Sequence, residues 1–140
     1  MGNRAIIALV DSDFNTGDLD APAIYLHWNG GRDSVEGFLR AAKEMYGTAH
    51  SAEYGAARLT TIICNWLTSK DDLSVGVGHY GKYRDWYTDN GVYWVNTRWQ
   101  IVGRNWTGDN KGPIREQYNH PIEGVKEHVL LAQPSIDVLA

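Results

Sequence analysis

The residues best suited to contact a ligand lie between an apolar run and a helical pattern. This segment places an imidazole, an indole, an amide, a guanidinium and a carboxylate around two glycines, and the candidates are His27, Trp28, Asn29, Arg32 and Asp33. Backbone N–H groups of a glycine turn at a helix start can hold an anion. The segment lacks the Gly-Lys-Ser/Thr of a P-loop and the three spaced glycines of a dinucleotide fingerprint. Buried His and Trp side chains with local partners are therefore the alternative interpretation.

A second group of candidates lies in residues 80–106, where eight aromatic residues are interleaved with basic ones. Aromatic rings beside guanidinium groups can stack on a base, which contributes about 1–3 kcal/mol per base, and the same residue types form hot spots of protein interfaces. A third interpretation divides the rings between the core and cross-strand pairs. The sequence leaves these three interpretations open. The candidate contacts are Tyr83, Arg84, Trp86, Arg98, Trp99 and Arg104.

Acid–base catalysis requires a histidine within hydrogen-bond reach of a carboxylate. His27 or His79 could use Asp33 in this way, which would suit a small hydrolase or transferase acting on a nucleotide. No motif marks a serine nucleophile, and Cys64 lies inside an apolar helical pattern typical of packing. We therefore assign no catalytic residue and favour a protein that is not an enzyme.

The acidic turn over residues 11–15 begins like a calcium-binding loop. Such a loop needs Gly at its sixth position and a bidentate Glu at its twelfth. This sequence has Thr16 and Pro22 there. We therefore predict a solvated loop between two strands, with no bound metal and no cofactor.

Composition narrows the classes of partner. The net charge of −4 and the pI of about 5.6 argue against binding to phosphate backbones, which depends on clustered Lys and Arg. The longest apolar run, residues 5–10, is far shorter than the roughly 20 residues of a membrane helix, and no export signal follows Met1. A single cysteine, which has no partner in the chain for a disulfide, is typical of a reducing compartment. The expected location is cytoplasmic.

The strands that would position the candidates follow from the spacing of apolar residues. Residues 5–10 and 23–28 are apolar at both parities, which predicts two buried strands. Residues 73–78 alternate apolar with small residues and predict a strand that leads to His79. The Asp-Asn-Gly at residues 89–91 predicts a type I′ hairpin turn with strands on both sides. After it, residues 92–95 and 98–102 predict a meander joined by a short turn at Asn96 and Thr97.

Three helices follow from the same kind of pattern. Asp33 and Glu36 have the spacing of a capping box at the start of the first helix. Ser51 predicts the cap of a second helix with a single apolar stripe. A third helix is predicted to begin at Pro121 and to end before Pro134.

These elements predict one α+β domain over residues 1–140, which is an ordinary length for a single domain. The sheet is expected to be mainly antiparallel, with an N-terminal strand pair and a C-terminal meander. A helix pair and a C-terminal helix should cover it.

Several short motifs resemble a group of small uncharacterised proteins from phages and prophages. The motifs are IYLHWNGG at residues 24–31, DNGVY at 89–93, IVGR at 101–104, EQ at 116–117 and QP at 133–134. The resemblance spans most of the chain but brings no assigned activity. It implies a counter-defence role in the host cytoplasm, such as an anti-CRISPR protein or a sponge for a nucleotide signal.

The leading hypothesis is a phage-type accessory protein that binds without catalysis, through its aromatic and basic residues. Its ligand would be a host defence protein or a nucleotide-like anion. A nucleotide site predicts a guanidinium facing a concave site beside Tyr or Trp, whereas a protein interface predicts a flat exposed patch. A structural or assembly subunit is a further alternative, and formation of a homo-oligomer stays open.

Overall fold

The computed structural model of the chain describes residues 2–66, 74–110 and 112–132. Within these ranges, five strands form one sheet in the order β3-β2-β1-β4-β5. The strands are β1 (Ala5–Leu9), β2 (Pro22–Leu26), β3 (Val75–His79), β4 (Val92–Val95) and β5 (Ile101–Asn105). β1 pairs with β4 in parallel, and the three other strand pairs are antiparallel. The predicted α+β fold with a mainly antiparallel sheet is therefore confirmed.

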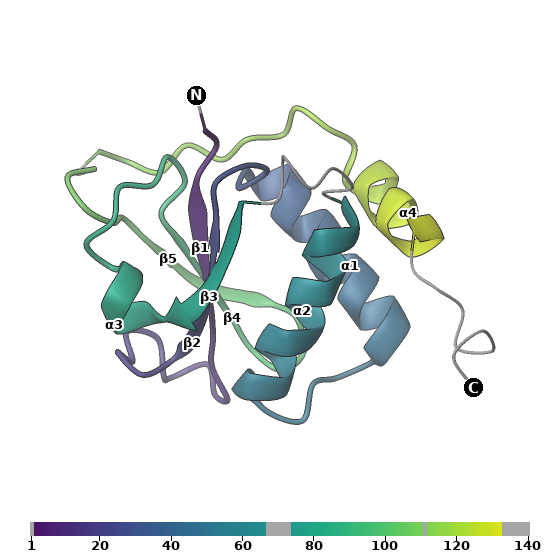
Figure 1. Cartoon of the computed structure of the whole chain (residues 1–140), viewed down its shortest axis with the longest axis horizontal. Helices are drawn as coiled ribbons and strands as arrows, with labels where there is room; N and C mark the ends of the chain where they lie inside the picture. Colours follow the sequence, from purple (N-terminus) through teal and green to yellow (C-terminus); the bar gives the residue numbers. More distant parts are fainter. Residues whose placement is uncertain (1, 67–73, 111, 133–140) are drawn as a thin grey trace.

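The helices lie on both sides of this sheet but are very unequal in size (Figure 1). Their bounds are α1 (Arg32–Tyr46), α2 (Ala52–Trp66), α3 (Tyr80–Tyr83) and α4 (Ile122–Ala132). α1, α2 and α4 lie together on one side, which we call the helix-covered face, and the short α3 lies on the other, which we call the second face. The predicted helix pair and C-terminal helix are confirmed, whereas α3 was not predicted.

Central strand β1 explains why two cores form. All its residues are buried, because its side chains point alternately to the two faces of the sheet and both faces are covered. Ile7 and Leu9 pack with α1 and α2 in the larger cluster, while Ile6 and Ala8 belong to a smaller cluster on the second face. An apolar run at both parities is the pattern expected for such a strand.

The predicted hairpin at residues 89–91 is wrong. Residues 80–83 form α3, and the chain from there to β4 makes no strand. Tertiary contacts explain the difference, because this turn is bonded to the N-terminal segment. Asp89 accepts a hydrogen bond from the N–H of Arg4 (2.9 Å), and the side-chain amide of Asn90 donates to Oδ1 of Asn3 (2.7 Å). These bonds align β4 beside β1 instead of beside a preceding strand.

The capping box predicted for the first helix is also wrong. α1 begins at Arg32, its N-cap is Gly31, and no side chain caps it. Asp33 instead lies in the first turn, where Oδ1 accepts the N–H of Ser34 (2.7 Å), and Glu36 pairs with Arg32 (2.9 Å). The cap predicted for the second helix is present, since Ser51 Oγ accepts the N–H of Tyr54 at a long 3.4 Å.

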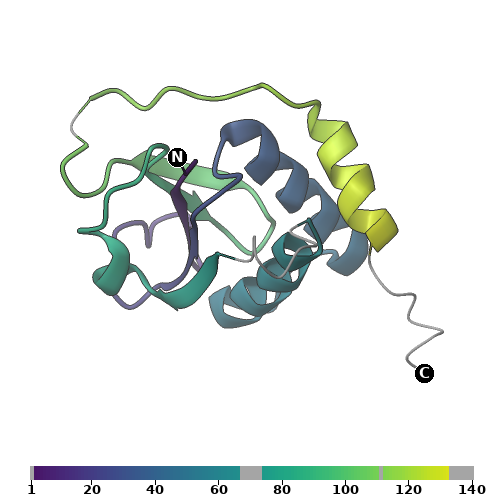
Figure 2. The same ribbon diagram turned by 45° about the horizontal axis from the view of Figure 1, so that its top comes forward.

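Residues 112–121, which we call the strap, cross one end of the sheet before α4 (Figure 2). Partly buried side-chain amides hold the strap in place: Asn3 donates to Oε1 of Gln117 (3.1 Å), and Gln117 donates to Oδ1 of Asn90 (3.2 Å). The strap carries the chain to α4, which packs on α1. Leu73 and Pro134, which served to predict a strand and a helix end, lie outside the described residues. Among the described helices, none combines the length and the apolar character needed to span a membrane.

Candidate functional site

Five partly exposed side chains gather at one edge of the second face, and we call them the aromatic surface. They are Tyr25, His27, Trp28, Trp86 and Tyr87. The first three come from the end of β2 and the residues after it, and the other two follow α3. Tyr25 and His27 are two residues apart and so point to the same side of the sheet. The surface thus joins two parts of the chain that are some sixty residues apart.

The rings of this surface hold one another at steep angles. Trp86 lies edge-on to Tyr25, with centroids 5.1 Å apart, and to the buried Tyr83, at 4.8 Å. The ring of Trp28 is nearly perpendicular to that of His27, with centroids 5.0 Å apart. Edge-to-face pairs of this kind are the favoured arrangement and add about 0.5–1.5 kcal/mol each beyond burial. Tyr25, His27, Trp28 and Trp86 are therefore held by neighbouring rings.

A tight turn after β2 presents Trp28 outward. Asn29 adopts a positive φ of 60°, and Gly30 follows. A Cβ atom on Gly30 would lie 2.6 Å from the Cβ of Ala5, so no other residue fits there. The hydroxyl of Tyr93 also donates a hydrogen bond to the carbonyl of Gly30 (2.6 Å). The turn is thus fixed against β1 and β4, and it leads directly into α1.

Tyr83 forms the base of the aromatic surface because β3 makes room for it. A Cβ on Gly76 or Gly78 would lie 2.9 or 3.1 Å from the hydroxyl oxygen of Tyr83. Burial raises the pKa of this hydroxyl, so it stays neutral at physiological pH. The alternation of valine and glycine in β3 therefore serves to seat one aromatic ring.

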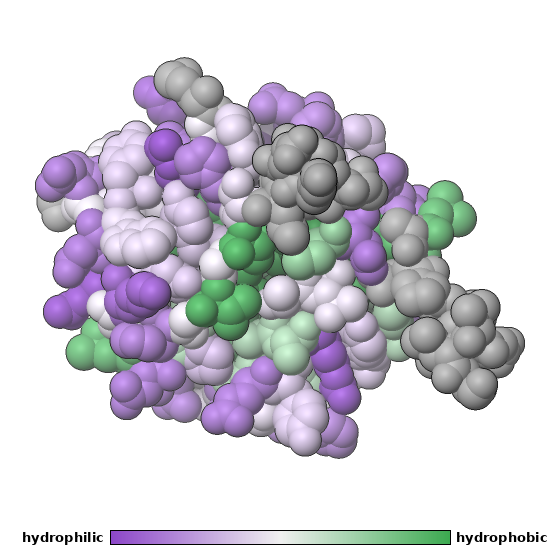
Figure 3. Space-filling view, viewed as in Figure 1, coloured by the Kyte–Doolittle hydropathy of each residue, from purple (hydrophilic) through white to green (hydrophobic). Residues whose placement is uncertain are grey.

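The aromatic surface is accessible and has basic neighbours. Trp28, Trp86 and Tyr87 are 37%, 42% and 51% exposed. The guanidinium of Arg4 lies 6.0 Å from the ring centre of Tyr87, and Arg84 is exposed nearby in sequence. In Figure 3 the region over α3 is mostly pale to purple, whereas green residues gather where β3 runs. An exposed patch of rigid aromatic rings beside cations is a typical contact surface.

The structure places three predicted residues elsewhere, under the strap. These are Arg32, Asp33 and Arg104. Asp33 is 2% exposed, and its Oδ2 accepts the N–H of His120 (2.7 Å). Its own N–H donates to the carbonyl of Gln117 (2.9 Å). At this helix start, where the sequence suggested that backbone donors could hold an anion, the N–H groups of Asp33 and Ser34 are thus bonded within the chain.

Arg104 is similarly engaged. Its guanidinium lies 3.6 Å from the ring centre of Tyr93 and donates to the carbonyl oxygens of Asn90 (2.6 Å) and Val92 (3.0 Å). Its Nε donates to Oε1 of Glu116 (3.1 Å), whereas Nη2, at the same distance, meets that oxygen at an angle unsuited to a hydrogen bond.

The second carboxylate oxygen of Glu116 lies 3.7 Å from Arg32. Burial by itself would lower the pKa of Arg32, but the hydrogen bond and charge of Glu36, with the charge of Glu116, raise it overall. Burial raises the pKa of the nearby Tyr93. Both arginines under the strap are therefore charged and paired, and they hold the strap.

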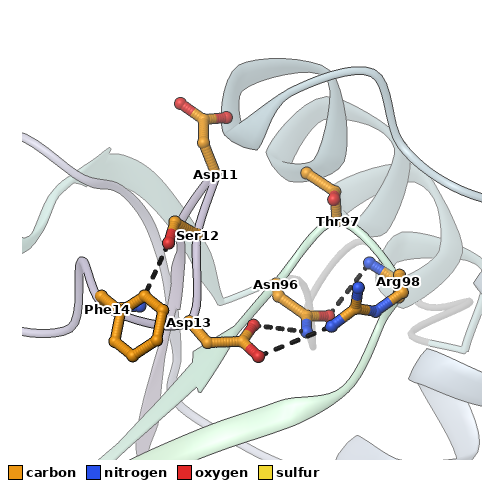
Figure 4. Close-up of a pocket in the computed structure, with 7 residues that line it drawn as sticks. All are labelled: Asp11, Ser12, Asp13, Phe14, Asn96, Thr97 and Arg98. Atoms are coloured by element: carbon orange, nitrogen blue, oxygen red, sulfur yellow. Dashed lines mark hydrogen bonds and ion pairs between the residues drawn. The ribbon is translucent and has the colours of Figure 1, made fainter.

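Arg98 and Trp99 lie at a third place, the turn between β4 and β5. Trp99 is buried, and its indole N–H donates to the carbonyl of Gly47 (2.5 Å). Arg98 borders a hollow of about 270 Å³ shown in Figure 4, where its guanidinium lies 3.5 Å from Asp13. Asp13 also accepts a hydrogen bond from Asn96 (2.8 Å). Both side chains, which were predicted to contact a ligand or partner, therefore interact with other residues of the chain.

The acid–base alternative finds no geometric support in the described part of the chain. The hydroxyl of Tyr25 lies 3.4 Å from Nδ1 of His27, and Nδ1 of His79 lies 3.3 Å from the carbonyl of Leu19. Neither histidine hydrogen-bonds a carboxylate among the described residues, and both oxygens of Asp33 are engaged by backbone N–H groups. Nor do these residues include a group of three or more His, Cys, Asp or Glu side chains placed to hold a metal ion.

In comparisons with known proteins, no protein-family model, curated protein or solved structure matched this chain.

The structure brings together His27, Trp28, Tyr83 and Trp86 from the two predicted groups, with Arg84 at the margin. Tyr25 was not among the predicted candidates, and Tyr87 was counted in the aromatic group of residues 80–106 but was not selected as a contact. The signal for Tyr25 was present, because it lies two residues before His27 on a predicted strand. Tyr87 carried no such signal, since it lies in a segment without regular structure.

Proposed function

We propose that this chain is a phage-type accessory protein that binds a host protein through the aromatic surface and blocks it, without catalysis. The observation that carries the proposal is the exposure of Trp28, Trp86 and Tyr87 on a base of packed rings. Trp and Tyr dominate the hot spots of protein interfaces because they bury a large area with few rotatable bonds. If the resemblance of the short motifs to small phage proteins reflects a common role, the partner is a host defence protein and the location is the host cytoplasm.

The placement of the arginines argues for a protein partner over a nucleotide-like anion. Arg104 and Arg98 are engaged by Glu116 and Asp13, so neither presents an unpaired charge to a phosphate. Arg84 is exposed beside Trp86, which suits the margin of a flat interface. The aromatic residues thus fall into two groups: Tyr93, Trp94 and Trp99 are core residues, while Trp28, Trp86 and Tyr87 are the proposed contacts.

The experiment compares three tagged forms of the chain in a bacterial host: wild type, the double variant Trp28→Ala/Trp86→Ala, and Tyr54→Ala. Tyr54 is a matched control because it is 57% exposed but lies on α2, away from the aromatic surface. We expect one host protein to co-purify with wild type and the control. Loss of two hot-spot rings should weaken its binding roughly 1,000-fold, because each such ring commonly contributes about 2 kcal/mol and every 1.4 kcal/mol is tenfold. Thermal unfolding checks that all three forms fold.

The same purified proteins distinguish the alternatives. Equal capture of that host protein by the double variant would disprove the role of the aromatic surface. Small molecules released on denaturation are identified by mass spectrometry after incubation with cyclic and linear nucleotides. A retained nucleotide would favour the sponge alternative, and a converted one would show an enzyme.

A further inference from the structure

The two edges of the sheet differ in how they are protected. β5 forms one edge, its pairing with β4 contains a register shift between Trp94 and Val95, and it carries the charged Arg104. Bulges and charges of this kind keep the edge of a sheet from pairing with another chain. β3 forms the other edge, with no Lys, Arg, Asp, Glu or Pro after its first residue Val75 and with an unbroken register to β2. Of the two edges, β3 is therefore the open one.

Two bonds that flank β3 show which of its backbone groups face β2. The N–H of His27 donates to the carbonyl of Ser74 (3.0 Å), and the N–H of Tyr80 donates to the carbonyl of Ala21 (2.9 Å). Both bonds join residues that lie opposite one another when the β2–β3 register is continued. In an antiparallel pair, residues that bond the neighbouring strand alternate with residues whose N–H and C=O point away from it. Every second residue from Ser74 to Tyr80 therefore bonds β2, and the residues between them point outward.

The outward residues of β3 are Val75, Val77 and His79. Their outward N–H and C=O groups make no backbone hydrogen bond to any other residue that the structure describes. Val77 is also 60% exposed, and its side chain lies on the same side of the sheet as that of Val75, which packs against the larger core cluster. The green residues of Figure 3 gather where this strand runs. The edge thus combines backbone donors and acceptors with an exposed β-branched side chain.

Packing on both faces fixes β3 in an extended form. On the second face, the hydroxyl end of Tyr83 lies against Gly76 and Gly78. On the helix-covered face, Val75 packs against the larger core cluster. The strand is therefore already ordered in the single chain, so that pairing with another strand costs it little conformational entropy.

The strand is complementary to itself. In a two-fold antiparallel pair centred on Val77, this residue lies opposite Val77 of the other copy, and Val75 lies opposite His79. The outward groups are spaced evenly about Val77, so each opposed pair can exchange two N–H···O bonds. The central valines form a β-branched cross-strand pair, and the strand has no Lys, Arg, Asp or Glu that would repel its copy. These features favour a second copy of this chain over a partner selected by charge.

We propose that two copies of this chain form a symmetric dimer in which their β3 strands pair antiparallel about Val77 and join the two sheets into one. The residues that pair include neither Trp28 nor Trp86, so the dimer does not depend on the function proposed above. Each copy contributes a strand of only five residues, and such a small interface is expected to be reversible.

The test is sedimentation of the full chain over a range of concentrations. Wild type should associate to a dimer, and Val77→Lys should weaken association at least about tenfold, because two ammonium groups meet at the two-fold axis and the valine pair is lost. Leu131→Lys is the matched control: it adds the same charge at an 85% exposed position on α4 and should leave the dimer unchanged. Thermal unfolding checks that all three forms fold.

Three results of this experiment would overturn the proposal. The first is wild type that stays monomeric at about 1 mM. In that case, loss of the co-purified host protein from Val77→Lys would assign the edge of β3 to that partner instead. The second is a folded Val77→Lys protein that associates like wild type, and the third is equal weakening by both lysine variants.

Disulfide cross-linking tests the register of the two strands. Val77→Cys places two thiols opposite one another, where Cα atoms of a bonded antiparallel pair are about 5.5 Å apart and a disulfide can form. His79→Cys is the control on the same strand, because its two copies would be about 14 Å apart, too far for a disulfide. Mild oxidation should cross-link Val77→Cys above the background of wild type, which carries Cys64, and His79→Cys should stay at that background. Equal cross-linking of the two variants would overturn an antiparallel pair centred on Val77.

Discussion

The two faces of the sheet are closed in different ways. On the helix-covered face, α1 and α2 contribute apolar side chains such as Phe38, Leu59 and Ile62, which are fully buried. On the second face, the strands contribute smaller residues such as Ala8 and Ala23, and the cover is made by aromatic rings such as Tyr83. Both faces are buried at the centre, but the covering elements differ in length and in the type of side chain they contribute.

The difference shows how an exposed aromatic surface can arise from a packing requirement. Two helices of fifteen residues each cover one face with aliphatic side chains. The other face has only the four residues of α3 and irregular loops, so large rings must span the gaps between them. Rings that are buried at one end and reach the margin at the other remain partly exposed. Such rings are available to a partner at little conformational cost.

The largest difference in the free energy of unfolding is expected between two variants that each remove one aromatic ring, one from each face of the sheet. Phe38→Ala removes a fully buried ring from the helix-covered face and should lower the free energy of unfolding by about 3–5 kcal/mol. Trp86→Ala removes a 42% exposed ring from the second face and should lower it by less, about 1–2 kcal/mol, because two edge-to-face pairs are lost but no sealed cavity forms. Urea unfolding followed by circular dichroism measures both. Equal losses would contradict the distinction between a sealed face and an exposed one.

A smaller effect is expected where β3 seats the aromatic surface. Gly76→Ala introduces a Cβ 2.9 Å from the hydroxyl oxygen of Tyr83, which must move together with Trp86. Overpacking of this kind should lower the free energy of unfolding by about 1–3 kcal/mol and change the fluorescence of the protein. Gly112→Ala is the control, because the space around its new Cβ is open, and it should leave stability nearly unchanged. Equal stability of the two variants would show that Tyr83 is not held by β3.

The smallest effect concerns an ion-pair cluster on the helix-covered side. Glu123 accepts hydrogen bonds from Lys126 (3.0 Å) and Arg40 (2.5 Å), and these bonds lower its pKa below the ordinary 4.5. A lowered pKa in the folded state contributes stability above the unfolded pKa, and that contribution is lost as the pH falls through the folded value. Because the cluster is exposed, the effect should be slight and screened by salt.

Urea unfolding of wild type and Glu123→Gln over a pH series tests this cluster. Wild type should be slightly the more stable at pH 7, and the difference should disappear in acid below the pKa of Glu123. A difference that persists unchanged in acid would contradict the assignment of the effect to the Glu123 carboxylate.

Local patterns predicted most of the elements. The apolar runs of β1 and β2 and the stripes of α1, α2 and α4 are short-range signals, because burial on one or two faces repeats with the period of the strand or helix. The hairpin at residues 89–91 failed because Asn90 bonds to Asn3, a contact across most of the chain. α3 escaped prediction because four residues are too few to show a helical period.

The candidate site was predicted in part, for the same reason. Residue type identified Trp28 and Trp86 as candidates, but only the contact of Trp28 with His27 and those of Trp86 with Tyr25 and Tyr83 place them on one surface. Residue type equally selected Trp99 and Arg104, which the fold uses for internal bonds. Residue type alone does not distinguish a tryptophan or arginine that bonds within its own chain from one that is available to a partner.

The sequence by itself determined that this chain forms strands and amphipathic helices in an α+β arrangement, because the spacing of apolar residues follows the period of each strand or helix. The tertiary structure alone decided which aromatic rings are core and which are exposed, and which arginines are paired. Those outcomes depend on strand order, on the path of the strap and on side chains that meet from distant segments. Contacts between distant segments leave no local pattern in the sequence, so the aromatic surface became visible only in the folded chain.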